Sequence, residues 1–327
     1  MPLPFLPRFA GREGQGDRGR TSSDGRFSRN TPAATLAASR DADATMNYRH
    51  AFHAGGFADV VKHAVLARIL VHLHAKPAAF RVIDTHAGAG IYDLAGPEAS
   101  RSAEWREGIG RLFGASIGEP ARSLLAPYLD VVAGLNSAGR LACYPGSPML
   151  ARAFLRPQDR LIACELEPNA AAALARHLGR DRRAKVVAID GWIALNAYVP
   201  PPERRGLVVV DPPFEEAGDF SRLTRVLEAA HRKWASGSYL LWYPIKTREE
   251  PDALARRLRR SGIAKILRVE LTLEPHEADR LGGCGLIAVN PPWTLESELA
   301  AMLPELTRLL AATGKSRHRV DWLVAER

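Results

Sequence analysis

The sequence predicts an α/β fold built on a mostly parallel, doubly wound sheet of seven strands, with a small helical insertion. Short apolar runs alternate with helical patterns, an order that is typical of parallel sheets covered by helices on both faces. The predicted strands are residues 80–84, 160–164, 184–189, 207–210, 238–242, 264–273 and 285–289. Only about 11 residues without a helical pattern separate the last two, too few for a crossover helix, so we expect this pair to be antiparallel.

The helices are predicted from the spacing of apolar residues. Val61, Val65 and Ile69 recur at helical spacing within residues 58–73, before the first strand. Roughly 70 residues separate the first two strands, which is more than one crossover helix needs, and helical patterns occupy 102–113 and 121–135. We therefore expect a helical insertion at about residues 92–146. The later helical patterns are 169–178, 220–234 and 251–260.

The charge of the chain favours a polyanionic partner such as nucleic acid. The 327 residues carry a formal net charge of +9, with a pI near 9.8. Residues 1–45 hold seven arginines and five acids, so the remaining residues keep +7 of this excess. That first segment is rich in Gly, Arg, Ser, Ala and Asp without periodicity, and we expect a disordered tail there, followed by one domain over 46–327. An arm that contacts RNA through its arginines is the alternative for the tail.

The composition gives no sign of a membrane or of an oxidising compartment. No stretch reaches the roughly 18 apolar residues of a membrane span, and the start lacks the apolar core of a signal peptide. Cys143, Cys164 and Cys284 are too few and too scattered for a disulfide framework or a metal cluster. We expect a cytoplasmic protein that has no membrane partner.

A glycine-rich turn follows the first strand, at Asp84-Thr85-His86-Ala87-Gly88-Ala89-Gly90. Its glycines let the backbone approach a ligand closely. A dinucleotide-binding turn would lead straight into a helix and be followed by an acid about 20 residues later, and neither feature is present here. The pattern favours S-adenosylmethionine over NAD.

Acids close the next strands as well. Glu165 ends the second strand, where a carboxylate can accept both hydroxyls of a ribose, although a surface-exposed acid is the alternative. Asp190 ends the third strand, followed by Gly191, and suits the amino group of an adenine. Together with Asp84 and Asp211, these acids end four successive strands and predict a cleft.

The fourth strand runs into Asp211-Pro212-Pro213-Phe214. A carboxylate can accept a hydrogen bond from an exocyclic amine, two prolines fix the turn and aim a backbone carbonyl at the same amine, and the ring can stack on a base. The alternative is a plain turn with a buried ring. A similar tetrapeptide, Asn290-Pro291-Pro292-Trp293, follows the last strand, and we interpret it as a structural turn because that strand is peripheral.

Histidines and aromatic residues are dense near the start of the domain, from Asn47 to His63. His50 and His53 have a spacing that metal ligands use, but no cysteine or further acid completes a set, so we expect no metal. Lys62 and His63 lie on the first predicted helix. They are either solvent-facing or, if the helix packs at the cleft, contacts for the carboxylate of the methionine moiety.

These residues resemble those of the bacterial ribosomal large-subunit RNA adenine-N6 methyltransferase J family over 46–327. The motifs that carry the resemblance are Tyr48-Arg49-His50 with Phe52-His53-Ala54-Gly55, Ala58-Asp59-Val60 with Lys62-His63, the glycine-rich turn, Tyr144-Pro145-Gly146-Ser147-Pro148, the Asp211 tetrapeptide, Leu241-Trp242-Tyr243-Pro244 and Val289-Asn290-Pro291-Pro292-Trp293. The resemblance implies a Rossmann-like class I fold and methyl transfer from S-adenosylmethionine to N6 of one adenine in 23S rRNA. The RNA would be protein-free or in an early assembly intermediate, and the enzyme a monomer.

The resemblance also implies roles for individual residues. The cofactor pocket would be lined by Lys62, His63, His86, Gly88, Ser147, Glu165, Asp190, Gly191 and Asp211. Asp211, Pro212 and Phe214 would act in catalysis, and Tyr48, His50 and Phe214 would contact the RNA. The chain departs from the family at Phe214, where the family has Tyr, and in the 45 residues before the family's usual start. Two alternatives stay open: a DNA adenine-N6 or cytosine-N4 methyltransferase, and a non-catalytic RNA-binding protein on the same fold.

Overall fold

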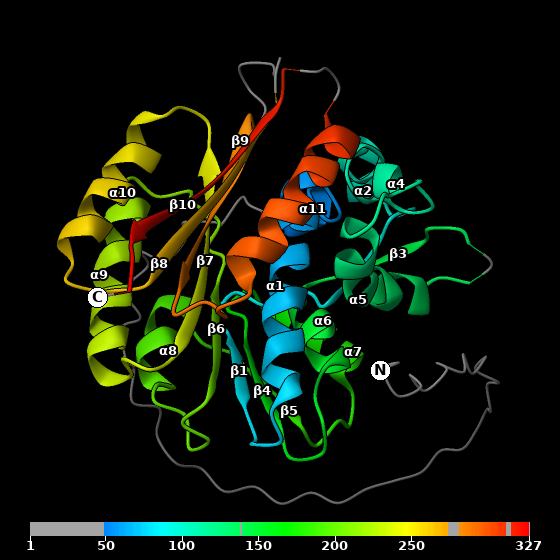
Figure 1. The fold of residues 1–327 in the computed structure, drawn as a ribbon. Coiled ribbons are helices and arrows are strands. Elements are labelled where there is room, and N and C mark those ends of the chain that lie inside the picture. Colours follow the sequence, from blue (N-terminus) through cyan, green and yellow to red (C-terminus); the bar gives the residue numbers. More distant parts are fainter. Residues whose placement is uncertain (1–48, 138, 274–280, 312–314, 327) are drawn as a thin grey trace, which may run out of the picture. The chain divides into compact units, whose positions relative to one another are not determined.

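The computed structural model contains an eight-stranded sheet with the order β10-β8-β9-β7-β6-β1-β4-β5 (Figure 1). It describes residues 49–137, 139–273, 281–311 and 315–326, so the tail predicted for residues 1–45 lies outside the described residues. The strands of this sheet are β1 (Arg81–Asp84), β4 (Arg160–Cys164), β5 (Ala184–Val187), β6 (Gly206–Val210), β7 (Ser238–Ile245), β8 (Ile266–Thr272), β9 (Gly283–Val289) and β10 (Arg317–Val324). The five strands from β7 to β5 are parallel, and β9, β8 and β10 extend the sheet by antiparallel pairing.

The predicted α/β class and the antiparallel pair of β8 and β9 are confirmed, whereas the predicted number of seven strands is wrong. The eighth strand is β10, which pairs with β8 at the edge of the sheet. It begins Arg317-His318-Arg319, and the side chains of these three residues are exposed. A run of basic residues has low strand propensity, so the apolar pattern used for the other strands does not reveal this one.

Helices cover both faces of the sheet (Figure 1). One face packs against α1 (Phe57–Ala75), α6 (Ser147–Ala153), α7 (Pro168–Leu178) and α11 (Leu295–Leu310), which share one core cluster with β1, β4 and β8. The other face packs against α8 (Gly191–Ala197), α9 (Asp219–Lys233) and α10 (Glu249–Arg260), in a second cluster with β6 and β7. None of the helices in the described part of the chain is long and apolar enough to cross a membrane.

Residues 91–145, between β1 and α6, form a small subdomain whose buried side chains join the core cluster of α1 and α11. Two short antiparallel strands, β2 (Ile91–Asp93) and β3 (Cys143–Pro145), lie before and after the helices α2 (Pro97–Ser102), α3 (Glu104–Glu107), α4 (Ile109–Leu112) and α5 (Ala121–Gly134). α5 packs on α1 and α11. This arrangement brings β3 and α5 next to the α1 residues that precede the sheet in sequence, including His63.

The strand order reverses between β1 and β6, because the chain continues from β1 to β4 and β5 on one side and from β6 to β7 on the other. Open α/β sheets bind ligands in the crevice outside the carboxyl ends of the strands at such a switch point. The acids predicted to end four strands therefore all lie at this one edge.

Candidate active site

Three charged side chains form a buried ionic triad at the carboxyl edge of the sheet. Lys62 of α1 forms an ion pair with Asp211, which follows β6, and its Nζ lies 2.8 Å from the Oδ1 of Asp59, one helical turn earlier. Both Lys62 and Asp59 are almost completely buried. Burial alone would lower the pKa of Lys62, but the carboxylates of Asp211 and Asp59 raise it well above its usual range. The lysine is therefore a permanent cation between two acids.

Asp59 also connects the triad to the segment before α1. Its Oδ2 accepts hydrogen bonds from the backbone N–H of Gly55 at 3.0 Å and pairs with Nε2 of His50, also at 3.0 Å. Burial opposes ionisation of Asp59, yet His50 and Lys62 together hold its pKa well below the usual range. The structure therefore places His50, a predicted RNA contact, within hydrogen-bond reach of the triad, while Tyr48 lies outside the described residues. Asp59 was not assigned a role from the sequence, although its spacing of three from Lys62 on a helix could have indicated the pair.

The aromatic part of the site follows the triad directly. Phe214 adopts a left-handed backbone conformation with φ of +53°, which is uncommon for a residue with a side chain. Its ring centroid lies 4.8 Å from that of Phe220 and 5.8 Å from that of Trp242. Such strained positions cluster at functional sites, where the surrounding structure holds them in place. The two supporting rings come from α9 and β7. Trp242 belongs to a motif that carries the family resemblance, but neither ring was assigned a role from the sequence.

The glycine turn after β1 is joined to the end of β4. Gly88 has φ of +63° and donates its N–H to Oε2 of Glu165 at 2.8 Å, while the N–H of Glu167 donates to Oε1 at 2.8 Å. A Cβ at Gly88 would lie 2.1 Å from the hydroxyl of Tyr92, so only glycine fits there. Burial raises the pKa of Glu165. Each carboxylate oxygen of Glu165 keeps a lone pair that can accept a further hydrogen bond.

The end of β5 and the start of α8 form the next part of the cleft. Asp190 caps α8 by accepting the N–H of Trp192 at 2.7 Å, and its other oxygen lies 3.6 Å from Arg222. A Cβ at Gly191 would lie 2.3 Å from the carbonyl oxygen of Thr85 and 2.5 Å from Nε2 of His86. Burial lowers the pKa of His86 to about 4, so this imidazole is neutral at pH 7.

Asp84 at the end of β1 is fully buried, and neither of its carboxylate oxygens has a hydrogen-bond partner among the described residues. Burial raises its pKa to about 7, and the nearby hydroxyl of Ser147 and N–H of His86 offset only part of this rise, since neither reaches hydrogen-bond geometry with the carboxylate. Ser147 is itself buried, at the start of α6. A buried carboxylate without partners beside a buried hydroxyl fits the cationic ammonium group of a methionine moiety.

His63 lies deeper than its neighbours in the predicted pocket. It is fully buried on α1, and its Nδ1 pairs at 2.7 Å with the hydroxyl of Tyr144, which pairs in turn at 2.9 Å with that of Tyr128. Its Nε2 has no hydrogen-bond partner among the described residues. Burial lowers the pKa of His63 to about 3, so the ring is neutral.

The second tetrapeptide is a structural turn, as predicted. The side-chain amide of Asn290 donates to the carbonyl oxygens of Ala235 and Gly237, both at 2.8 Å. Because β9 is antiparallel to β7, this turn lies at the sheet edge opposite to Asp211. Within the described ranges, no group of three or more His, Cys, Asp or Glu residues is arranged to hold a metal ion.

Comparisons with known proteins identify the family of the chain. Residues 77–324 match the family described as ribosomal RNA large subunit methyltransferase D, RlmJ. The ribosomal RNA large subunit methyltransferases J of Escherichia coli and Haemophilus influenzae are 40% and 37% identical to this chain, over 86% of it and over their whole length. The crystal structure of protein LPL1258 from Legionella pneumophila is 35% identical, covers 83% of this chain and 98% of its own, and has a TM-score of 0.76. The chain therefore belongs to the RlmJ family of ribosomal RNA large subunit methyltransferases.

Proposed function

We propose that this protein transfers a methyl group from S-adenosylmethionine to N6 of one adenine in 23S rRNA. The observation that carries the proposal is the Asp211 turn, in which a carboxylate held by Lys62 and a ring held by two other rings lie together at the topological switch point. The relatives of this chain from E. coli and H. influenzae are named ribosomal RNA large subunit methyltransferases. An rRNA substrate places the reaction in the cytoplasm. We take the monomer that the family resemblance implies as the active unit.

The cleft residues fit the parts of S-adenosylmethionine. Glu165 has acceptor capacity for the ribose hydroxyls, and Asp190 lies where it can accept the adenine amino group. Gly88 and Gly191 leave room for close approach of the cofactor beside His86. Asp84 and Ser147 suit the ammonium group of the methionine moiety. Two of the three N–H donors of Lys62 engage carboxylates, and the third remains for the methionine carboxylate.

We propose that Asp211 and Pro212 activate the target amine. When bound, S-adenosylmethionine supplies a methyl group on a positively charged sulfur, which makes that group a strong electrophile. The N6 lone pair of adenine is delocalised into the ring until its hydrogens are held. Lys62 engages Oδ2 of Asp211, so we assign Oδ1 and the carbonyl oxygen of Pro212 to the two amine hydrogens. Asp211 then accepts a proton as the nitrogen becomes tetrahedral, and the Phe214 ring stacks on the base.

The proposal is tested by offering purified protein three substrates with labelled S-adenosylmethionine: protein-free 23S rRNA, assembled large subunits and duplex DNA. We expect labelling of N6 of one adenine in the protein-free rRNA. Labelling of the DNA instead would favour the DNA methyltransferase alternative. Failure to bind S-adenosylmethionine in a calorimetric titration would favour the non-catalytic alternative. Mapping N6-methyladenine in 23S rRNA from cells with and without the gene tests the same assignment in vivo.

A further inference from the structure

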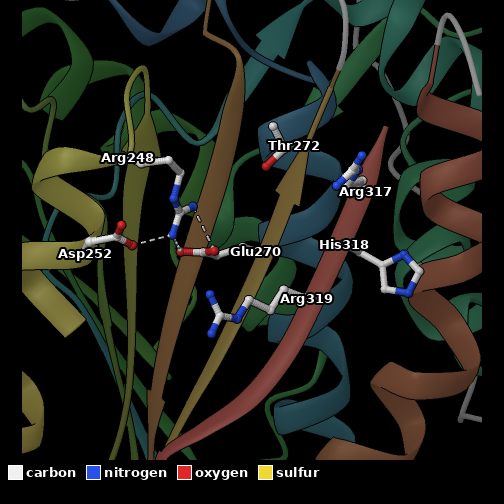
Figure 2. A pocket seen from close by; sticks show the side chains of 7 residues that line it. All are labelled: Arg248, Asp252, Glu270, Thr272, Arg317, His318 and Arg319. Atoms are coloured by element: carbon white, nitrogen blue, oxygen red, sulfur yellow. Dashed lines mark hydrogen bonds and ion pairs between the residues drawn. The ribbon is translucent and has the colours of Figure 1, made fainter. Parts of the chain in front are cut away.

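A second concave surface lies on the sheet at the edge strand, outside the proposed active site (Figure 2). This hollow has a volume of about 480 Å³. Its lining residues come from the start of α10, from β8 and from β10: Arg248, Asp252, Glu270, Thr272, Arg317, His318 and Arg319. Three of the seven are arginines, so the hollow is the type of surface that binds anions.

The strand register places the hollow at the same sheet edge as Asp211. Arg317 pairs with Thr272, Thr272 with Gly283, and Gly283 with Ile245, so these residues form one row across β10, β8, β9 and β7. In the same way Arg319 lies in one row with Tyr243 of β7. Val210 pairs with Leu241, so Asp211 is level with the residue that precedes Tyr243 on β7. Four interstrand spacings separate β6 from β10, about 19 Å at roughly 4.8 Å each. A few nucleotides of RNA can span such a distance.

The acids of the hollow are already engaged. Glu270 is almost completely buried and accepts hydrogen bonds from the hydroxyl of Tyr243 at 2.8 Å and from Arg248 at 2.9 Å. Asp252 accepts from Arg248 at 2.7 Å (Figure 2). Gly285 leaves room for the Tyr243 ring that donates to Glu270, since a Cβ at Gly285 would lie 2.0 Å from that ring. Both carboxylates thus hold Arg248 in place at the rim of the hollow.

The arginines on β10 present their charge to solvent. Arg317 is exposed and has no hydrogen bond or ion pair among the described residues. Arg319 is half exposed, and its Nε pairs at 2.9 Å with Asp321, which also holds the buried Arg268. His318 points away from them, toward α11, where its ring pairs with the hydroxyl of Thr307 (Figure 2). Alternation along the strand therefore puts both arginines on the face of the hollow.

We propose that Arg317, Arg319 and Arg248 bind phosphate groups of the RNA a few nucleotides away from the target adenine. This inference rests on the proposed function and extends it from the adenine pocket to the backbone beside it. Charge complementarity selects the partner. Arg317 is exposed, Arg319 is half exposed beside Asp321, and Arg248 stays 44% exposed while it pairs with Glu270 and Asp252. Exposed guanidinium groups of this kind suit phosphate oxygens. Charged residues on an edge strand also prevent that edge from pairing with other chains, and this role needs no RNA.

The test compares two double variants of the full chain with the same loss of charge. The first is Arg317→Glu with Arg319→Gln. The control is Arg259→Glu with Arg260→Gln, two exposed arginines in the last turn of α10, which runs back toward the opposite sheet edge. The measurements are KM for protein-free 23S rRNA, kcat, the affinity for S-adenosylmethionine, and the slope of log KM against log salt concentration.

We expect the first variant to raise KM for RNA by about tenfold or more and to reduce the salt slope by roughly 1 to 2, with kcat and cofactor affinity unchanged. The control should behave as wild type. An unchanged KM and salt slope in the first variant, or an equal change in the control, overturns the inference. If the first variant unfolds, Arg317→Glu alone gives the same readout, since that side chain has no hydrogen bond or ion pair to lose among the residues that the structure describes. Failure of the proposed function would differ, because the wild-type protein itself would then not methylate the RNA.

Discussion

Replacement of Asp211 by Asn tests the proposed chemistry most directly. Asn keeps the size of the side chain and can still accept a hydrogen bond from the amine, but it cannot take up a proton. Loss of a general base lowers rates by about 10²- to 10⁴-fold, or roughly 3–5 kcal/mol of transition-state stabilisation. We therefore expect kcat for rRNA methylation to fall by that factor, with the dissociation constant of S-adenosylmethionine changed by only a few-fold.

The structure also bounds the effect of this substitution on stability. Lys62 keeps Asp59 at 2.8 Å when Asp211 is neutralised, so the ammonium group is not left without a counter-charge. The loss is then one charge-assisted hydrogen bond, about 1.5–3 kcal/mol, rather than the larger cost of a buried unpaired charge. Urea unfolding measures this loss, and turnover should be expressed per folded molecule.

Glu298→Gln is the matched control, because it removes one carboxylate that pairs with the same helix. Glu298 accepts two hydrogen bonds from Arg68 of α1, both at 2.9 Å, and the pair is mostly buried. We expect a stability loss of similar size with normal turnover per folded molecule. Turnover within about tenfold of wild type for Asp211→Asn would refute Asp211 as the base. So would an equal loss of turnover in the control.

Substitutions at four further positions test other parts of the site. Gly191→Ala should weaken binding of S-adenosylmethionine by about tenfold or more in calorimetry, because the new Cβ displaces His86, and unchanged affinity would contradict the close packing. Phe214→Ala should raise KM for RNA by roughly 5- to 150-fold, because base stacking is lost. Phe214→Tyr keeps a ring and should leave KM near wild type. An equal rise of KM in both variants would argue against stacking. Tyr144→Phe should lower the free energy of unfolding by about 1–3 kcal/mol in urea, since two buried hydrogen bonds lose a partner, and a neutral result would mean that those bonds add nothing. The pKa of His63 is lowered from 6.5 to about 3 in the fold, so the unfolded chain binds more protons between these values and stability is lost as pH falls through that range. The free energy of unfolding of wild type relative to His63→Leu should thus fall by about 2 kcal/mol between pH 7 and pH 5. The same difference between the two proteins at both pH values, measured by urea unfolding, would contradict this.

The parallel part of the fold could be predicted because its strands are buried on both faces. Continuous apolar runs such as Leu207–Val210 stand out against the helices between them, and the strand-end acids follow at once. The edge of the sheet could not be predicted in the same way. β10 is amphipathic and its first residues are charged, so burial leaves little trace in its sequence. The hollow beside it was missed for the same reason, since it depends on that strand.

The surroundings of the site residues could not be predicted, because they depend on partners distant in sequence. Asp84 was recognised as a strand-end acid, but its two unpaired buried oxygens depend on the surrounding packing. Phe220 and Trp242 support Phe214 from a helix and from the next strand, and nothing in their own segments indicates that contact. A sequence reveals which groups end a strand, whereas the environment of each group is a property of the assembled fold.

The ionic triad is better explained by positioning than by stability. Burying charges is costly, and a buried ion pair adds little to the free energy of folding compared with apolar residues of similar size. Lys62 and Asp59 nevertheless occupy the interior beside Asp211, where leucine or methionine would fill the same space. The ion pair with Lys62 fixes the Asp211 carboxylate through one oxygen, Oδ2, and this leaves the other oxygen, in a set direction, for the proposed contact with the substrate amine. A flexible carboxylate would sample many orientations, and rates depend steeply on the alignment of the reacting groups. The same argument explains why Asp59 also binds His50, since one buried carboxylate then sets the position of the predicted RNA-binding segment relative to Asp211, the proposed base.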